Sequence, residues 1–289
     1  EAGVITPTSM FNTSPGWIPN GRYRTTDTHN YGVLDTTGVI RKSSNVGASL
    51  IAKRLGDAQF DAFLRRFGYG HVTGSGFPGE AAGLFPSHQR WSGTSKQTIS
   101  YGYGLNATPL QIATAYAALG NGGLLHQPSF VKGQHGTPKQ VLDPAIANQV
   151  LHMMQTVTEP GGTATQAAIL GYHVAGKTGT SRKASAGGYS RRYIGYFAGL
   201  VPVDKPRFSM VVAINDPTKG SYYGGIVSGP VFRNVMEGAL RMMDVSPDNL
   251  DAWLAAQAAA EAKRAKAAGH AVPVQAVADA ATAAAGALQ

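Results

Sequence analysis

The sequence contains no cysteine, few charged residues and no long hydrophobic run. The absence of cysteine excludes disulfide bonds, thiolate metal sites and a cysteine nucleophile, but it leaves the redox compartment open. No uninterrupted apolar stretch approaches the roughly 18 to 20 residues of a membrane-spanning helix. The first residues also lack the pattern of a signal peptide.

The residues that are present have the composition of a globular protein. Of the 289 residues, 43% are hydrophobic and only 14% are charged, which favours a folded core over a disordered chain. The 25 basic residues outnumber the 16 acidic ones and give a formal net charge of +9. Because the charges are scattered along the chain, we predict no nucleic-acid partner.

The first half of the chain alternates between loop-rich stretches and helical patterns. Glu1–Gly3 resembles the end of a helix because Gly3 and the following Pro7 are stop signals, so we expect the chain to begin within a fold. Residues 7–41 are rich in Thr, Asn, Gly and Pro and lack periodicity, which predicts an irregular surface segment. Apolar spacing then predicts two short helices, the first starting at Ser44 and the second N-capped by Asp57.

The second half has clearer signals. Thr108 and Gln111 match a capping box with Pro109 at the first helical position, which predicts the start of a helix. We further expect helices over 145–157 and 230–243, strands over 172–178, 193–201 and 208–214, and an Ala-rich flexible tail over 249–289. The sequence therefore predicts an α/β (α+β) domain over residues 1–248, built on a small antiparallel sheet, followed by the tail.

Two motifs compete for the same stretch of sequence, and the first is a phosphate loop. Gly171–Thr178 matches the pattern G-x-x-x-x-G-K-[ST], and Met210–Asp216 resembles the strand that holds magnesium in nucleotide hydrolases. Such a loop must lead into a helix whose N–H groups bind phosphates. The residues after Thr178 have no apolar stripe, and Tyr172–Val174 have the residue types of a strand. A nucleotide-binding protein is therefore kept only as an alternative function.

The second motif is Lys177-Thr178-Gly179, the K-T-G triplet of penicillin-recognising enzymes that use an active-site serine. Lys177 offers a positive charge to a substrate carboxylate, and the hydroxyls of Thr178 and Thr180 can bind that carboxylate. Gly179 leaves room for substrate beside the strand, and the resemblance assigns the Thr180 N–H to the oxyanion hole.

The accompanying S-x-N motif is Ser43-Ser44-Asn45, placed just before a predicted helix. Ser43 can relay a proton to the leaving amine, and the Asn45 amide can hydrogen-bond the substrate amide and a catalytic lysine. An S-x-N match is expected about once by chance in a chain of this size, and a K-T-G match about 0.1 times. S-x-N alone is weak evidence, since Ser44 could simply be a helix N-cap. The occurrence of S-x-N and K-T-G together, in this order, is what indicates a penicillin-recognising enzyme.

Several further motifs complete a family pattern. The chain carries Arg41-Lys-Ser-Ser-Asn-Val-Gly47, Gly76-Phe-Pro-Gly-Glu80, Ser100-Tyr-Gly-Tyr-Gly-Leu105, Thr108-Pro-Leu-Gln-Ile112, Gly162-Thr-Ala164, Val174-Ala-Gly-Lys-Thr-Gly-Thr180 and Tyr193–Pro202. Together they resemble the class B penicillin-binding proteins, most closely the division-specific peptidoglycan D,D-transpeptidases of Gram-negative bacteria. The resemblance runs from Glu1 to about Leu250.

This resemblance implies a penicillin-recognising serine transpeptidase fold, with an antiparallel sheet flanked by helices and an all-helical subregion carrying S-x-N. It implies serine acyl transfer on peptidoglycan stem peptides, without a cofactor, and β-lactam antibiotics as further ligands. The implied partners are membrane proteins of the division machinery. The implied location is the periplasmic face of the inner membrane, with an upstream helix as anchor.

The family's nucleophile is the serine of an S-x-x-K motif, which should lie roughly ten residues before Glu1. No such motif precedes Ser43. We therefore expect a transpeptidase domain that is incomplete at its N-terminal side and inactive alone. Ser129-Phe-Val-Lys132 matches S-x-x-K literally, but it follows the S-x-N motif, and its residue types predict the start of a strand. We reject Ser129 as the nucleophile.

The same resemblance assigns Tyr103, Arg182 and Tyr223 to the substrate site, with Tyr101 as a weaker candidate. Half-buried packing is the alternative explanation for the tyrosines. A β-lactamase and a penicillin sensor are alternative functions within the same superfamily, but Ser44 stands where a class A β-lactamase has aspartate. The eight histidines show no metal-binding spacing, so no metal site is predicted.

Overall fold

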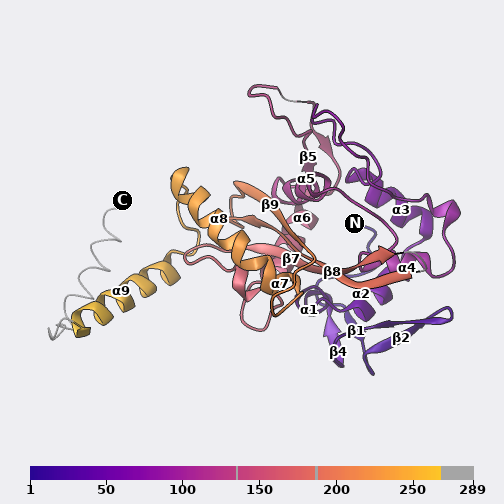
Figure 1. Ribbon diagram of the computed structural model, residues 1–289, viewed down its shortest axis with the longest axis horizontal. Helices are drawn as coiled ribbons and strands as arrows, with labels where there is room; N and C mark the ends of the chain where they lie inside the picture. Colours follow the sequence, from indigo (N-terminus) through magenta and orange to yellow (C-terminus); the bar gives the residue numbers. More distant parts are fainter. Residues whose placement is uncertain (135, 186–187, 268–289) are drawn as a thin grey trace.

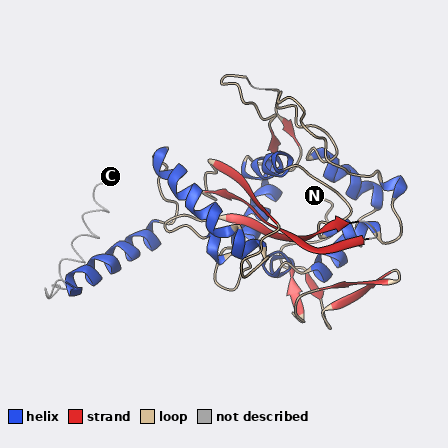
Figure 2. Cartoon of the chain, in the orientation of Figure 1, coloured by secondary structure: helices blue, strands red, loops and turns tan. Residues whose placement is uncertain are grey.

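The computed structural model is a mixed α/β structure in which helices surround a central antiparallel sheet (Figure 1). It describes residues 1–134, 136–185 and 188–267. Figure 2 shows the sheet in the middle of the molecule, small strand pairs above and below it in this view, and the last helix pointing away from the body. None of the helices in these described ranges combines the length and the hydrophobicity needed to cross a lipid bilayer.

The central sheet has three strands in the order β7-β8-β9, namely β7 Ala175–Ser185, β8 Gly188–Val201 and β9 Phe208–Asn215. Both pairings are antiparallel, which confirms the predicted sheet and the predicted turn between its last two strands. Strand β7 begins at Ala175 rather than Tyr172, and it continues well past Thr178.

Alternate residues of β8 face two different helical layers. Phe197 packs with the residues of α8 (Gly229–Met242), whereas Leu200 packs with those of α6 (Pro144–Gln155). Since successive side chains of a strand point to opposite faces, α8 and α6 cover opposite faces of the sheet. Both helices lie where the sequence predicts them, within one or two residues at the ends.

Helix α5 (Pro109–Gly120) also forms as predicted. The Thr108 hydroxyl accepts a hydrogen bond from the Gln111 N–H (3.1 Å), and the Gln111 side chain accepts one from the Thr108 N–H (2.8 Å). Proline occupies the first helical position, where it costs no hydrogen bond. The Gln111 amide also donates to the carbonyl of Ala82 (2.9 Å), so the capped end anchors the preceding loop region to the helix.

The segment 7–41 is the main error of the sequence prediction, because it is not irregular. It forms four short strands and one helix: β1 Met10–Asn12, β2 Trp17–Asn20, β3 Tyr23–Thr26, β4 Val33–Asp35 and α1 Thr36–Lys42. Strand β1 pairs with β4, and β2 pairs with β3. Strands of three or four residues are too short to show a period of two, so the sequence carries no visible signal for them.

The remaining elements are short helices, the last helix and one small strand pair. They are α2 Asn45–Ala52, α3 Asp57–Arg66, η1 His88–Arg90, α4 Ser95–Ser100, η2 Thr165–Ala167, α7 Gly224–Val227 and α9 Leu250–Ala267, and a two-residue strand pair is formed by β5 Leu124–Leu125 and β6 Lys139–Gln140. The helices predicted at Ser44 and near Asp57 are both present. Asp57 is not the N-cap of α3, however, because Gly56 holds that position and Asp57 is the first helical residue.

Helix α9 occupies the first part of the predicted Ala-rich tail and extends away from the body in Figure 1. Its start is tied to the domain, since the Asn249 N–H donates to the Gly171 carbonyl (3.0 Å) and Trp253 lies against Gly171. Residues 268–289 lie outside the described residues. The division into a domain over 1–248 and a flexible tail over 249–289 stays a prediction.

Candidate active site

The two predicted motifs meet at one hydrogen bond. Lys177 on β7 donates from Nζ to the Ser43 hydroxyl (2.6 Å), across 134 residues of sequence. Ser43 sits at the C-cap of α1 in the left-handed region (φ 55°), so the backbone turns sharply there before α2 begins. The structure therefore places the K-T-G strand and the S-x-N corner beside each other.

Burial sets the protonation of Lys177. Desolvation lowers the pKa of its amine to about 8, because an ammonium ion loses hydration when it is buried. Within the described ranges, no carboxylate forms an ion pair with Lys177 that would oppose this shift. Its second hydrogen bond goes to the Thr178 carbonyl (3.0 Å). Lys177 is thus largely charged at pH 7, and it changes charge within the range where most enzymes can be assayed.

Asn45 is the first residue of α2, whose N-cap is Ser44. The Ser44 hydroxyl accepts from the Gly47 N–H (2.8 Å) and donates to the Asp27 carboxylate (2.6 Å), which fixes the turn. The Asn45 amide donates to the Thr26 carbonyl (2.9 Å). Its predicted bonds to a substrate amide and a catalytic lysine therefore stay a prediction, although its position beside Ser43 suits them.

The residues of β7 after Lys177 alternate between the two faces of the sheet, with Thr178 and Thr180 on one face and Gly179 on the other. Thr178 Oγ1 lies 2.9 Å from Thr163 Oγ1, and Thr180 Oγ1 accepts from the Gly224 N–H (3.1 Å). Gly179 lies against the ring of Tyr196, where a Cβ atom would come within 1.9 Å of ring carbon. Glycine at this position is therefore required by packing on the sheet.

Several aromatic side chains lie near Arg182 on β7. The backbone N–H of Arg182 donates to the Tyr103 hydroxyl (3.2 Å), and the Arg182 guanidinium lies 5.9 Å from the centre of the Tyr193 ring. Tyr223 is 48% exposed and stacks on Tyr222 (4.8 Å between ring centres). Tyr222 stacks in turn on Tyr193 (4.1 Å). The structure therefore brings the predicted residues Arg182 and Tyr223 to one aromatic surface.

Tyr101 and Tyr103 are also neighbours, with ring centres 6.0 Å apart in an edge-to-face arrangement. Tyr101 accepts a hydrogen bond from Thr25 (3.4 Å), which fits a packing role as well as a binding role. Sequence reasoning missed Thr163 and Tyr196 as residues that shape the K-T-G strand. Thr163 belongs to the Gly162-Thr-Ala164 motif, but nothing in that motif indicates its contact with Thr178.

The phosphate-loop alternative is wrong. Thr178 lies inside an 11-residue strand and does not start a helix, so Gly171–Thr178 does not lead into the helix N-terminus that a phosphate loop requires. The rejection of Ser129 as a nucleophile also agrees with the structure, although the predicted strand start is wrong. Ser129 lies in the exposed loop between β5 and β6, and its hydroxyl accepts from the nearby Val131 N–H (3.0 Å).

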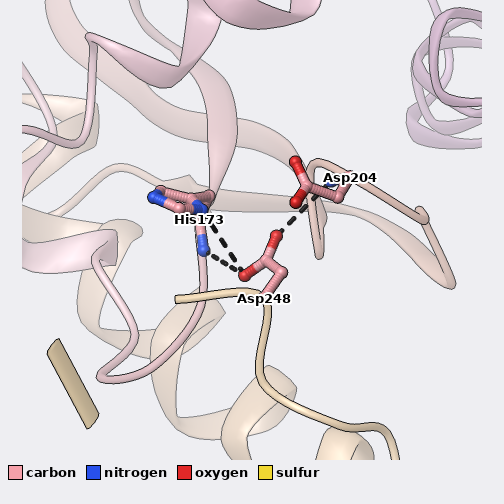
Figure 3. Close-up of side chains that lie close together, drawn as sticks. All are labelled: His173, Asp204 and Asp248. Atoms are coloured by element: carbon pink, nitrogen blue, oxygen red, sulfur yellow. Dashed lines mark hydrogen bonds and ion pairs between the residues drawn. The ribbon is translucent and has the colours of Figure 1, made fainter. Parts of the chain in front are cut away.

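One cluster in the described part of the chain has residue types that could bind a metal ion. His173, Asp204 and Asp248 bring their potential ligand atoms within 4.8 Å of one another (Figure 3). The Asp248 carboxylate, however, already accepts from the backbone N–H groups of His173 (2.7 Å) and Val203 (3.1 Å). We interpret Asp248 as a structural residue that ties the segment before α9 to the segment that enters β7 and to the segment that leaves β8.

A sheet that sets a K-T-G strand beside an S-x-N corner, between layers of helices, defines the class of penicillin-recognising proteins. The chain belongs to the family of the penicillin-binding protein transpeptidase domain, whose profile matches residues 1–237. This match confirms the predicted fold and the predicted family.

Individual relatives agree with this assignment. The chain is 44% identical over 252 residues to the peptidoglycan D,D-transpeptidase FtsI of Escherichia coli, a match that covers 86% of this chain and 42% of the relative. It is 42% identical over 250 residues to the probable peptidoglycan D,D-transpeptidase PenA of Neisseria flavescens, covering 86% of this chain and 62% of the relative. The chain thus spans less than half the length of the Escherichia coli relative.

Solved structures show the same fold. The transpeptidase domain of penicillin-binding protein 3 from Burkholderia pseudomallei superposes with a TM-score of 0.80 at 35% identity, covering 84% of this chain and 75% of that domain. A peptidoglycan glycosyltransferase from Burkholderia ambifaria superposes with a TM-score of 0.76 at 35% identity, with the same coverage of both chains.

Proposed function

We propose that this chain is part of a peptidoglycan D,D-transpeptidase that builds the septal cell wall by serine acyl transfer without a cofactor. The observation that carries the proposal is the 2.6 Å hydrogen bond from Lys177 to Ser43, which joins the two motifs of the family at one place. The names of the relatives support peptidoglycan as the substrate. The functions in the names of these relatives favour transpeptidation over a β-lactamase or a penicillin sensor.

The attacking serine comes, in this proposal, from polypeptide outside the 289 residues. The one S-x-x-K match in the sequence lies at Ser129, in an exposed loop. The serine oxygen would attack the carbonyl of the D-Ala-D-Ala amide, the C–N bond would break, and the serine proton would reach the departing D-alanine amine through Ser43. An amine of a neighbouring stem peptide would then take the acyl group from the ester.

The other residues of the site have supporting roles in this reaction. The Lys177 ammonium faces the donor carboxylate, and the hydroxyls of Thr178 and Thr180 bind it. Asn45 holds the donor amide, and Tyr103, Arg182 and Tyr223 line the surface on which the donor lies. A β-lactam carries a carboxylate and a reactive amide in the same relation, so it would form a long-lived ester at the same serine.

The location and partners of the protein follow from the same resemblance. We propose that it acts on the periplasmic face of the inner membrane, anchored there by another part of the whole protein, and that membrane proteins of the division machinery bind it. The similarity to FtsI supports this placement. Separating membrane and soluble fractions of cells and detecting the whole protein with an antibody tests it.

Labelling with a fluorescent penicillin tests the proposed activity. A longer chain that includes the upstream serine is expected to gain one covalent adduct, seen as a single mass increase, whereas the 289-residue chain is expected to gain none. The Ser129→Ala variant of the longer chain is the control, and it should label as fast as the parent. An unlabelled longer chain that instead binds a nucleotide tightly would contradict the proposal.

The pH profile of acylation tests the charge of Lys177. Since the pKa of its amine is about 8, the protonated fraction falls about tenfold between pH 7 and pH 9, while a penicillin carboxylate stays ionised. We therefore expect the second-order acylation rate constant to fall by about tenfold over this range. The control is Lys177→Arg, which keeps its charge at pH 9 and should show no such fall. A rate that rises with pH would show that the neutral amine is the active form.

A further inference from the structure

The hydroxyl of Thr163 lies next to the hydroxyl of Thr178, which binds the donor carboxylate in the proposed reaction. Thr163 follows the turn after α6, and its Oγ1 lies 2.9 Å from Oγ1 of Thr178, the middle residue of K-T-G. A hydroxyl has one hydrogen to donate and two lone pairs to accept with. The direction of this single hydrogen bond therefore sets whether Thr178 still has a hydrogen to offer to a ligand.

Thr180 shows which direction suits an anionic ligand. Its Oγ1 accepts from the Gly224 N–H (3.1 Å), which can only donate, so the hydrogen of Thr180 remains free. Thr178 and Thr180 stand two residues apart on β7 and share a face of the strand. If Thr163 donates to Thr178, both threonines accept from the protein and both present a hydrogen to the same side.

We propose that Thr163 is a positioning residue that donates its hydroxyl hydrogen to Thr178, so that the Thr178 hydroxyl points its own hydrogen at the carboxylate of the acyl donor. This inference rests on the proposed function. It adds a residue outside the K-T-G strand to the machinery that selects donors with a free carboxylate.

Packing holds the Thr178 side chain in the required rotamer. A Cβ atom on Gly225 would lie 3.2 Å from the Thr178 methyl group and 2.1 Å from the Thr163 carbonyl oxygen, so the backbone of Gly225 lies directly against both threonines. Rotation of Thr178 would exchange its methyl group and its hydroxyl, and threonine is stiff about this bond. The methyl group facing Gly225 thus keeps the hydroxyl directed at Thr163.

The turn that carries Thr163 is itself fixed to the S-x-N corner. Lys42, the residue before Ser43, donates from Nζ to the Gly161 carbonyl (2.9 Å), and Arg41 donates to the Pro160 carbonyl. On the other side of Thr163, Ala164 is fully buried in the core. One short turn therefore contacts the helix that ends at Ser43 and the strand that carries Lys177, which makes Thr163 a rigid support.

Two substitutions at this position separate positioning from structure. In the longer chain that includes the upstream serine, Thr163→Val keeps the shape and removes the hydrogen bond, and Thr163→Ser keeps the hydroxyl. The matched control is Thr165→Val, because Thr165 is an exposed threonine two residues further on. Each chain is treated with benzylpenicillin and with its methyl ester, and the acylation rates are measured over a range of concentrations.

The expected result is a loss that depends on the carboxylate. Thr163→Val should lower the second-order rate constant for benzylpenicillin about tenfold, the effect of about one hydrogen bond to a charged group. The loss should lie mainly in the apparent binding constant, and Thr163→Ser should restore the rate to within about twofold of the parent. For the methyl ester, parent and Thr163→Val should react equally, and Thr165→Val should match the parent throughout.

Other outcomes overturn the inference in distinguishable ways. Equal losses for the acid and the ester, or a lower melting temperature with no rescue by Thr163→Ser, would show that Thr163 acts only through structure. An unchanged rate for Thr163→Val would show that Thr178 needs no support. If the parent chain itself forms no adduct, the proposed function fails, and this inference fails with it.

Discussion

Replacing Lys177 with methionine is expected to slow the acylation of the longer chain by penicillin by a factor on the order of 10³. In the parent, Lys177 Nζ lies 2.6 Å from the Ser43 hydroxyl. Methionine has a similar length, but it cannot donate to that hydroxyl and it brings no charge to the donor carboxylate. Both losses act on the reacting groups, which is why the effect should exceed that of any other single substitution proposed for this protein. Rapid-mixing measurement of fluorescent penicillin labelling gives the rate.

Lys183 provides a matched control on the same strand. It is partly exposed, and its amine donates to the Asn215 side chain (2.9 Å) rather than to Ser43. Lys183→Met removes the same charge from β7 and should leave the labelling rate within about twofold of the parent, as expected for a change in a screened surface charge. If the two variants slowed labelling equally, the general positive charge of β7 would matter and the contact with Ser43 would not.

Replacing Gly179 with alanine is expected to cost about 1 to 3 kcal/mol of stability and to slow acylation on the order of 10²-fold. The added Cβ would lie 1.9 Å from the ring of Tyr196, a distance that no pair of carbon atoms tolerates without a bond. Either the ring or strand β7 must move, and a shift of about 1 Å in β7 would carry Lys177 and Thr178 with it. Chemical denaturation and penicillin labelling measure the two effects.

The cause of this loss can be isolated with two further variants. Gly238 lies in α8 with open space where a Cβ would be, so Gly238→Ala should stabilise the chain by about 0.5 to 1 kcal/mol. In a double-mutant cycle with Tyr196→Ala, alanine at position 179 should cost much less, because the ring that it meets has been removed. Full additivity of Gly179→Ala and Tyr196→Ala would argue against the steric explanation.

The parts of the fold that the sequence predicts well are those held by local interactions. The capping box of α5 joins Thr108 to Gln111 within a single helical turn, so its signal is visible in four letters. The turn between β8 and β9 likewise depends on a short cluster of prolines and polar residues. Helices α6 and α8 each have a long apolar stripe that reflects burial against the sheet.

The parts that the sequence predicts poorly depend on distant partners. Strand β1 exists because Met10 to Asn12 pair with the strand that ends at Asp35, and three residues show no pattern of their own. The far half of β7 was missed because Ser181 to Ser185 are mostly polar and have little buried surface. Their strand conformation comes from pairing with β8, which no local preference reveals.

For the site, the order of the motifs and the chemical character of their residues are properties of the chain alone. A lysine, hydroxyls and a glycine in K-T-G, together with S-x-N, are enough to indicate the family and the kind of ligand. The lowered pKa of Lys177, the contact of Thr163 with Thr178 and the fit of Gly179 against Tyr196 arise only after folding. Burial, hydrogen-bond direction and steric fit depend on which distant segments become neighbours, and that depends on the packing of the whole domain.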